Sequence, residues 1–331
     1  MTQPFHSRLE YSQVLSTQQS LPFCAVVAEG LSAPRKRLPC RFFYDRAGSE
    51  LFERITRLPE YYLTRTEQAI LERFAPEMIA AAGENIALVE FGSGSSGKTR
   101  LLLEAALAQQ ERVHYLPIDI SGDFLYASSL ELLAEYDRLT ITALAAEYLD
   151  GIAALPRLDV PRLILFLGSS IGNFTTDEAV AFLTHVRSQM APQDRLLIGV
   201  DLLKERSIIE AAYNDAEGVT AAFNKNLLVR INHELGGRFD LDAFDHYAPF
   251  VEAESRIEMH LVSRKPQVAP IAALEHSFSF QEGETIHTEN SHKYSLSGFV
   301  ALCRRAGLTL QARWHDDREW FGLLLFQPTT A

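Results

Sequence analysis

Residues 92–99, with the sequence GSGSSGKT, combine residue types and spacing that could hold a phosphate-bearing ligand. They match every fixed position of the pattern G-x-x-x-x-G-K-[ST], in which backbone amides and the lysine hold phosphates and the hydroxyl binds Mg²⁺. The apolar run 86–91 before the segment predicts a strand, and residues 99–107 after it predict a helix. A strand, a glycine turn and a helix N-terminus form the usual cradle for a nucleotide-like ligand.

Two carboxylates near this glycine loop favour a ligand that carries positive charge. Glu90 precedes the glycines, where it would repel a polyphosphate at close range but attract a sulfonium and an ammonium. Asp119, which lies 25 positions after Gly94 (119 − 94), could accept hydrogen bonds from ribose hydroxyls, as the acid about 20 residues after a dinucleotide-type loop does. Asp201 could still supply the acid that a P-loop enzyme needs. A methyltransferase that uses S-adenosylmethionine is therefore favoured, and a P-loop nucleotide-binding protein stays open.

The elements that must position these residues alternate between short apolar strands and helices. Strands are predicted at 86–91, 113–119, 139–144, 162–167 and 195–202. Helices are predicted at 64–82, with Thr64 or Thr66 as N-cap, and at 99–107, 122–136 and 177–189. This alternation predicts an α/β fold whose parallel sheet is covered on both faces and binds ligands at the carboxyl ends of its strands.

The alternation ends near residue 204, which predicts a second domain. The later segments are expected to be a polar lead and helix within 1–30, a helix at 208–233, a loop at 239–250, antiparallel strands at 257–262 and 273–280, a helix at 295–306, and a hairpin of 309–315 with 322–326. We predict one domain at 65–203 and 293–331, and a second at 15–64 and 204–292.

Composition narrows the class of protein. The 331 residues are 47% hydrophobic and 22% charged, as in ordinary globular proteins, and the net charge of −12 leaves no global basic surface for nucleic acid. The three cysteines are too few and too scattered for a disulfide framework. The N-terminus lacks the pattern of a signal peptide, and the apolar runs are too short to span a bilayer. We expect a cytoplasmic monomer that binds neither nucleic acid nor membrane.

An aromatic-rich segment at 38–67 places six aromatic side chains among polar residues, between prolines and a glycine. Such a segment either packs on a core or forms a ligand lid, because a tyrosine offers both apolar area and a hydrogen bond. Composition favours neither interpretation over the other.

Six sequence blocks together resemble the histidine-specific Nα-methyltransferases of ergothioneine biosynthesis, from about residue 20 to the C-terminus. The blocks are LPEYYLTRTE at 58–67, VEFGSG at 89–94 with KTR at 98–100, FLGSSIGN at 166–173, YNDAEGVTAAFN at 213–224, RIEM at 256–259 and TENS at 288–291. The resemblance implies a Rossmann-like class I methyltransferase sheet with an inserted α+β substrate-binding domain. It also implies three methyl transfers from S-adenosylmethionine to the α-amino group of L-histidine, which give hercynine, the first step of ergothioneine biosynthesis.

The resemblance assigns cofactor and substrate residues to this chain. Those for S-adenosylmethionine are Gly92, Gly94, Lys98, Asp119, Glu147, Tyr148 and Gly168. Glu147-Tyr148 departs from the Asp-Phe pair that the family usually shows at the adenine, and Lys98 would either reach the methionine carboxylate or stabilise the loop. No metal is expected, although His287 and His292 lie near each other.

The substrate residues implied by the resemblance fall into three groups. Asn173 would take the amino group with Tyr44 close to it, and these two are the candidate catalytic residues. The carboxylate and pocket residues are Tyr61, Tyr213 and Phe52. Glu289 and Ser291 would bind the two imidazole nitrogens, with Met259 packed on the ring, and as residues two apart on a strand they would face the same side. A methyltransferase for another amino acid, such as a tryptophan derivative, and a relative that has lost activity remain alternatives.

Overall fold

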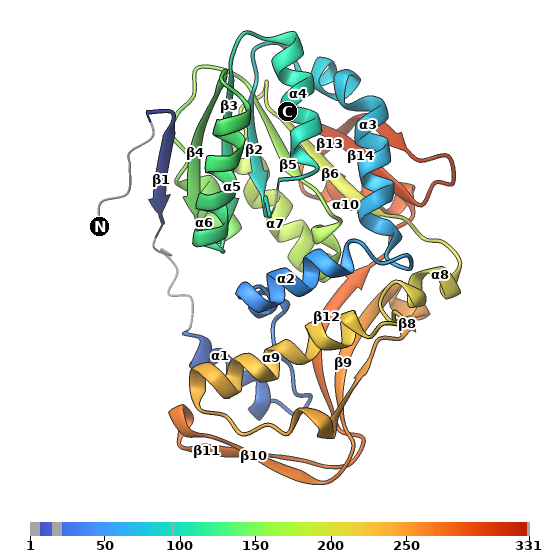
Figure 1. Cartoon of the computed structure of the whole chain (residues 1–331). Coiled ribbons are helices and arrows are strands. Elements are labelled where there is room, and N and C mark those ends of the chain that lie inside the picture. The colour runs from blue at the N-terminus through green and yellow to red at the C-terminus, as the bar shows by residue number, and fades with distance from the viewer. Residues whose placement is uncertain (1–6, 15–21, 95, 330–331) are drawn as a thin grey trace. The chain divides into compact units, whose positions relative to one another are not determined.

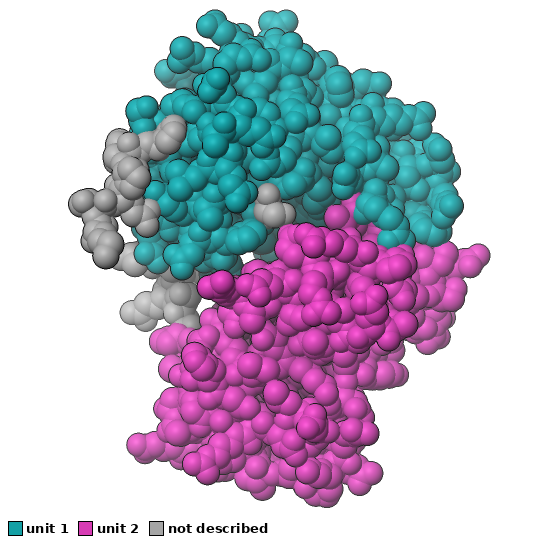
Figure 2. Space-filling model, in the orientation of Figure 1, with its two compact units in different colours: residues 1–18, 65–202, 294–331 teal, residues 19–64, 203–293 magenta. Residues whose placement is uncertain are grey.

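The computed structural model describes residues 7–14, 22–94 and 96–329. They form two compact units, shown in different colours in Figure 2. Unit 1 contains the described residues within 1–18, 65–202 and 294–331, and unit 2 those within 19–64 and 203–293. The predicted domains differ from these units by one residue at two boundaries, since Leu203 and Lys293 group with unit 2. Residues 7–14, which neither predicted domain included, group with unit 1.

Unit 1 is built on an eight-stranded sheet with the order β1-β4-β3-β2-β5-β6-β14-β13 (Figure 1). Its strands are β1 (Leu9–Gln13), β2 (Ala87–Phe91), β3 (Val113–Asp119), β4 (Leu139–Ala145), β5 (Arg162–Phe166), β6 (Arg195–Asp201), β13 (Leu308–His315) and β14 (Phe321–Pro328). The strand order reverses at β2, whose neighbours are β3 and β5, so the glycine loop that follows β2 lies at the topological switch point where such sheets bind ligands. The prediction of a Rossmann-like α/β sheet is confirmed.

Helices cover both faces of this sheet. They are α3 (Tyr62–Ala82), α4 (Thr99–Gln109), α5 (Gly122–Glu135), α6 (Tyr148–Ala153), α7 (Thr176–Ser188) and α10 (Leu296–Arg305), with a 3-10 helix η2 (Ser170–Asn173) after β5. One apolar cluster joins α3, α4 and α5 to one face of the sheet, and a second joins α6, α7 and α10 to the other. Successive residues of β2 alternate between the clusters, because side chains of a strand point to opposite faces.

Three details of unit 1 differ from the prediction. Residues 9–13 were expected in a polar lead, yet they form β1, which pairs in parallel with β4 at the sheet edge. The sheet is mixed, because β14 runs antiparallel to β6 and forms the expected hairpin with β13. Helix α3 begins at Tyr62, two residues before the predicted N-cap at Thr64. The first two differences depend on pairing between distant segments, which local pattern does not reveal.

Unit 2 combines helices with two small antiparallel sheets. Its elements are α1 (Phe23–Ser32), η1 (Cys40–Phe43), α2 (Arg46–Ile55), α8 (Arg206–Ala211), α9 (Val219–Leu235), β7 (Phe244–Tyr247), β8 (Phe250–Val251), β9 (Arg256–Ser263), β10 (Gln267–Ile271), β11 (His276–Phe280) and β12 (Thr285–His292), with 3-10 turns η3 (Leu241–Ala243), η4 (Glu252–Glu254) and η5 (Ala272–Leu274). Strands β12, β9 and β7 form one sheet, onto which β8 pairs, and β10 and β11 form the other.

Several predictions for unit 2 were wrong. The helix expected at 208–233 is divided into α8 and α9, because the turn at 213–218 ends with Gly218 at a φ of +70°. The loop expected at 239–250 contains β7. The antiparallel strands expected at 257–262 and 273–280 correspond to β9 and β11, which belong to different sheets. Strand β12, of which the sequence analysis expected only the extended segment around Glu289 and Ser291, pairs with β9 and carries these two predicted substrate residues. Among the described residues, no helix is long and apolar enough to cross a membrane.

Candidate active site

The two glycines of the loop after β2 are required by backbone geometry. Gly92 has a φ of +67° and Gly94 a φ of +49°, a region that side chains other than glycine rarely adopt. A Cβ on Gly92 would also lie 2.9 Å from the hydroxyl of Tyr148. The loop therefore turns sharply at the carboxyl end of β2 and leaves its backbone open to close approach by a ligand.

Asp119 at the end of β3 is connected directly to this loop. Its carboxylate accepts the N–H of Gly94 at 3.1 Å and that of Ser121 at 2.9 Å. Burial raises the pKa of Asp119, and the backbone N–H donors oppose that shift. Ser93 in the same loop has a buried hydroxyl oxygen without a hydrogen-bond partner among the described residues. A carboxylate and a hydroxyl at the switch point suit the ribose and polar groups of an adenosyl ligand.

The carboxylate of Glu90, which the sequence argument associated with a positively charged ligand, is buried and hydrogen-bonded within the protein. Its side chain is buried on the α3–α4 face of the sheet, where it accepts the hydroxyl hydrogens of Thr99, at 2.7 and 2.8 Å, and of Tyr115. Burial raises the pKa of Glu90 to about 7, although these donors and the charge of Lys98 oppose the shift. The hydrogen bonds of Glu90 in β2 therefore connect the start of α4, at Thr99, to β2 and β3 of the sheet.

Lys98 forms an ion pair with Glu67 of α3. The same carboxylate accepts the N–H of Gly168 after β5, at 2.8 and 3.1 Å. Gly168 has a φ of +73°, and a Cβ there would lie 3.4 Å from the Lys98 ammonium. One carboxylate of α3 thereby joins the glycine loop to the turn after β5. In this structure the lysine and the threonine of the P-loop pattern are bound to Glu67 and Glu90, and this pairing does not support a phosphate-binding role.

The remaining predicted residues of unit 1 follow β4 and β5. Tyr148 begins α6 and packs its ring against Phe91 and Phe166, at centroid distances of 5.5 Å to each. Glu147 occupies the N-cap position of α6, and Asn173 ends η2, half-buried. Their roles at the adenine and at the amino group stay predictions.

In unit 2, a run of aromatic rings joins the N-terminal segment to α9. Tyr44 contacts Phe52 at 5.7 Å, Phe52 contacts Tyr61 at 6.3 Å, and Tyr61 contacts Tyr213 at 6.3 Å, all edge-to-face. Phe223 of α9 touches both Tyr44 and Phe52, at 5.8 and 5.9 Å. The predicted tyrosines and Phe52 therefore belong to one cluster, as binding a single small molecule requires.

A β-bulge in β12 determines which of its side chains lie on the same face of the sheet as Met259 of β9. Thr288 is the extra residue, and the register shifts between His287 and Glu289. After the bulge, Glu289 pairs with Met259 and Ser291 with Ile257, and all four are buried. The expectation that Glu289 and Ser291 share a face with Met259 is consistent with this register. Without the extra residue, these two side chains would point to the opposite face.

Ser291 links the strand to the aromatic cluster. Its hydroxyl lies 2.6 Å from that of Tyr213, and the ammonium of Lys293 donates to Ser291 at 2.8 Å and to Tyr213 at 3.0 Å. Burial raises the pKa of Glu289 to about 7, and the charge of Lys293 opposes that shift. Lys293 was missed by the sequence analysis, although residues 289, 291 and 293 alternate as one face of a strand does.

Comparison with known proteins identifies the family. A sequence model described as "Histidine-specific methyltransferase, SAM-dependent" matches residues 23–328. A histidine N-alpha-methyltransferase of Mycolicibacterium smegmatis is 43% identical over 299 residues, which cover 90% of this chain and 92% of that protein. The chain belongs to the histidine-specific, S-adenosylmethionine-dependent methyltransferase family.

Two further relatives support the same assignment. A histidine N-alpha-methyltransferase of Mycobacterium tuberculosis is 42% identical over 90% of this chain and 92% of that protein. Ergothioneine biosynthesis protein 1 of Neurospora crassa is 32% identical over 86% of this chain, which spans 32% of that longer protein. The methyltransferase therefore uses S-adenosylmethionine, and the P-loop alternative is not supported.

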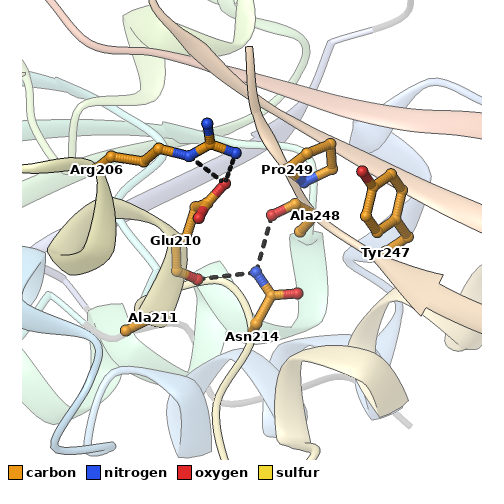
Figure 3. Close-up of a pocket in the computed structure, with 7 residues that line it drawn as sticks. All are labelled: Arg206, Glu210, Ala211, Asn214, Tyr247, Ala248 and Pro249. Atoms are coloured by element: carbon orange, nitrogen blue, oxygen red, sulfur yellow. Dashed lines mark hydrogen bonds and ion pairs between the residues drawn. The ribbon is translucent and has the colours of Figure 1, made fainter. Parts of the chain in front are cut away.

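The backbone around Tyr213 of the methyltransferase is held by polar contacts. Figure 3 shows Asn214 between the backbone oxygens of Glu210 and Ala248, to each of which it donates at 2.8 Å. His246 contacts the carbonyl of Tyr213 at 2.8 Å. The adjacent open surface hollow of about 390 Å³ is lined by Arg206, Glu210, Ala211, Asn214, Tyr247, Ala248 and Pro249. Its lining includes none of the predicted substrate residues.

No cluster of three or more His, Cys, Asp or Glu side chains within 7–14, 22–94 and 96–329 has the arrangement of a metal site. His287 instead contacts the Asn290 side chain at 2.9 Å. The side chains predicted to recognise the substrate carry hydroxyl, carboxyl and amide groups, aromatic rings and one thioether.

Proposed function

We propose that the methyltransferase trimethylates the α-amino group of L-histidine to hercynine, the first step of ergothioneine biosynthesis. The observation that carries the proposal is the buried face of β12, where Glu289 and Ser291 lie in register with Met259 and Ile257. A carboxylate and a hydroxyl beside an apolar wall suit a planar ring with two polar nitrogens. Such a site rejects side chains that lack the nitrogens, because its own polar groups would be left unpaired.

The residues assigned to the cofactor lie in unit 1, around the switch point of the sheet. Gly92 and Gly94 allow close approach of the backbone, Asp119 would hold the ribose hydroxyls, and Gly168 lies in the turn that follows the neighbouring strand β5. S-adenosylmethionine supplies an electrophilic methyl group when bound. Lys98 stabilises the loop through Glu67, and a contact of Lys98 with the methionine carboxylate remains a proposal. Glu147 and Tyr148 are proposed at the adenine.

The amine must be bound without being held as an ammonium, because methyl transfer requires a nitrogen lone pair. Asn173 would do so with its amide, whereas a carboxylate would favour the charged form that cannot react. Tyr44 would lie close to the same group. Tyr61 and Tyr213 would donate to the substrate carboxylate, and Phe52 would line the pocket. Aromatic faces near the trimethylammonium product also favour its charge through cation–π attraction.

The decisive experiment is mass spectrometry of L-histidine incubated with the purified protein and S-adenosylmethionine. We expect intermediates with one and two added methyl groups and a final product with three. L-Tryptophan and a prenylated tryptophan serve as competing substrates. Methylation of a tryptophan derivative in preference to histidine would contradict the substrate assignment, and no methylation of any of them would indicate a relative without activity.

Calorimetry separates the proposal from the nucleotide-binding alternative. S-adenosylhomocysteine should bind, and Mg·ATP should not compete with it. Tight binding of Mg·ATP in the absence of S-adenosylhomocysteine binding would overturn the cofactor assignment.

A further inference from the structure

Lys293 is a buried cation that contacts two of the predicted substrate residues, Tyr213 and Ser291. Its exposed fraction is 2%, and its ammonium donates to the hydroxyls of Tyr213 and Ser291 at 3.0 and 2.8 Å. The same ammonium lies 4.7 Å from the centre of the Tyr213 ring. Burial of a lysine is costly and requires compensating partners, so this arrangement calls for a reason beyond packing.

The three groups constrain the directions of their hydrogen bonds. An ammonium has donors only, so Tyr213 and Ser291 both act as acceptors toward Lys293. The two hydroxyls are 2.6 Å apart, and one of them donates to the other. The hydrogen of the second hydroxyl is therefore directed outside this triad. A hydroxyl hydrogen oriented in this way suits a partner that accepts hydrogen bonds, and it does not suit a donor.

The positive charge also acts on the third polar residue of the same strand face. Glu289 is buried two positions before Ser291, and the charge of Lys293 favours its ionised form against the effect of burial. An ionised Glu289 accepts the N–H of a neutral imidazole. One cation thus supports both an acceptor at Glu289 and a donor at the Tyr213–Ser291 pair.

We propose that Lys293 is a positioning residue for recognition of the amino-acid substrate, acting through its hydrogen bonds to Tyr213 and Ser291. This rests on the proposed function. Lys293 acts without touching the substrate: by donating to both hydroxyls it makes each an acceptor toward the ammonium, so one of the two hydroxyl hydrogens points out of the triad. The pair offers one hydrogen to a ligand, and either the carboxylate or an unprotonated ring nitrogen of the amino acid is a matching acceptor.

The test compares Lys293→Met and Lys293→Gln with a matched control, Lys36→Met. Lys36 is also partly buried in unit 2, where it pairs with Glu284 and lies 5.1 Å from the Phe280 ring centre, but it contacts none of the proposed substrate residues. We expect Lys293→Met to raise the KM for histidine at least tenfold while the KM for S-adenosylmethionine and the Kd for S-adenosylhomocysteine stay within twofold. Lys293→Gln keeps hydrogen-bond donors but has no charge, so its KM for histidine should lie between those of the wild type and Lys293→Met.

Two outcomes would overturn the proposal. One is an unchanged KM for histidine in a folded Lys293 variant, and the other is an equal rise in the Lys36→Met control, which would indicate general loss of stability in unit 2. If Lys293→Met does not fold, as judged by circular dichroism, the KM of Lys293→Gln for histidine tests the proposal instead. Failure of the wild type to methylate histidine would instead refute the proposed function, so the two failures are distinguishable.

Discussion

The ion pair of Glu67 and Lys98 predicts an asymmetric loss of stability when either partner is neutralised. Removing one partner of a fully buried pair costs about 3–5 kcal/mol, because the other charge is left uncompensated. The Glu67 side chain is 1% exposed, and that of Lys98 is 26% exposed. Lys98→Met leaves the buried carboxylate, so we expect a loss of about 3 kcal/mol. Glu67→Gln leaves an ammonium that can turn toward solvent, so we expect only about 1–2 kcal/mol.

Urea unfolding followed by tryptophan fluorescence measures these losses in the relevant unit, because Trp314 and Trp320 both belong to unit 1. The double variant should lose less than the sum of the single variants, with a coupling of about 1–2 kcal/mol. Asp317→Asn is the control: Asp317 is 91% exposed in its pair with Arg73, so its loss should stay within about 0.5 kcal/mol. Additive losses, or a larger loss for Glu67→Gln than for Lys98→Met, would refute the reasoning.

Three further predictions concern the loop and the ring-binding strand. Glu289→Gln should lower kcat/KM for histidine about 10- to 100-fold, which is the effect of losing one charged hydrogen bond. The Kd for S-adenosylhomocysteine should stay within twofold, and an equal loss of histidine activity and of S-adenosylhomocysteine affinity would contradict the imidazole role. Gly92→Ala should weaken S-adenosylhomocysteine binding measured by calorimetry, because Gly92 has a φ of +67° and a Cβ there would lie too close to the Tyr148 hydroxyl. Adding Tyr148→Phe, which removes that hydroxyl, should restore part of the affinity. Burial raises the pKa of Glu90 from 4.5 to about 7, so the folded protein keeps a proton that the unfolded chain releases. Its contribution to stability therefore falls as pH rises from about 4.5 to 7, by on the order of 3 kcal/mol. The unfolding free energy should fall more steeply across this range in the wild type than in Glu90→Gln, because the buried Glu289 contributes its own fall to both proteins; parallel curves would contradict the prediction.

The pattern match to a phosphate-binding loop illustrates how a local motif acquires its chemistry from its surroundings. The letters of residues 92–99 are those of a P-loop, but Lys98 is paired with a carboxylate 31 positions earlier in the chain, and Thr99 donates to Glu90. Neither partner belongs to the motif. A search restricted to the motif cannot distinguish a lysine available to phosphate from one that holds two loops together.

The sequence by itself determined the elements whose formation depends on neighbouring residues. Apolar runs and helical periodicity placed β2 to β6 within about one residue at each end, and the glycines after β2 mark a turn that only glycine adopts easily. The family blocks indicated most of the predicted site residues for the same reason, since each block is contiguous in the chain.

Only the tertiary structure decided which side chains meet across long separations. Lys293 contacts Tyr213 across 80 residues, β1 joins the sheet beside β4, and the bulge at Thr288 keeps Glu289 and Ser291 on the Met259 face. These contacts depend on strand pairing and burial, whose free energy is gained only after the chain has closed long loops. A pattern of neighbouring residues carries no record of such partners, because the same strand sequence shifted by one residue presents the opposite face.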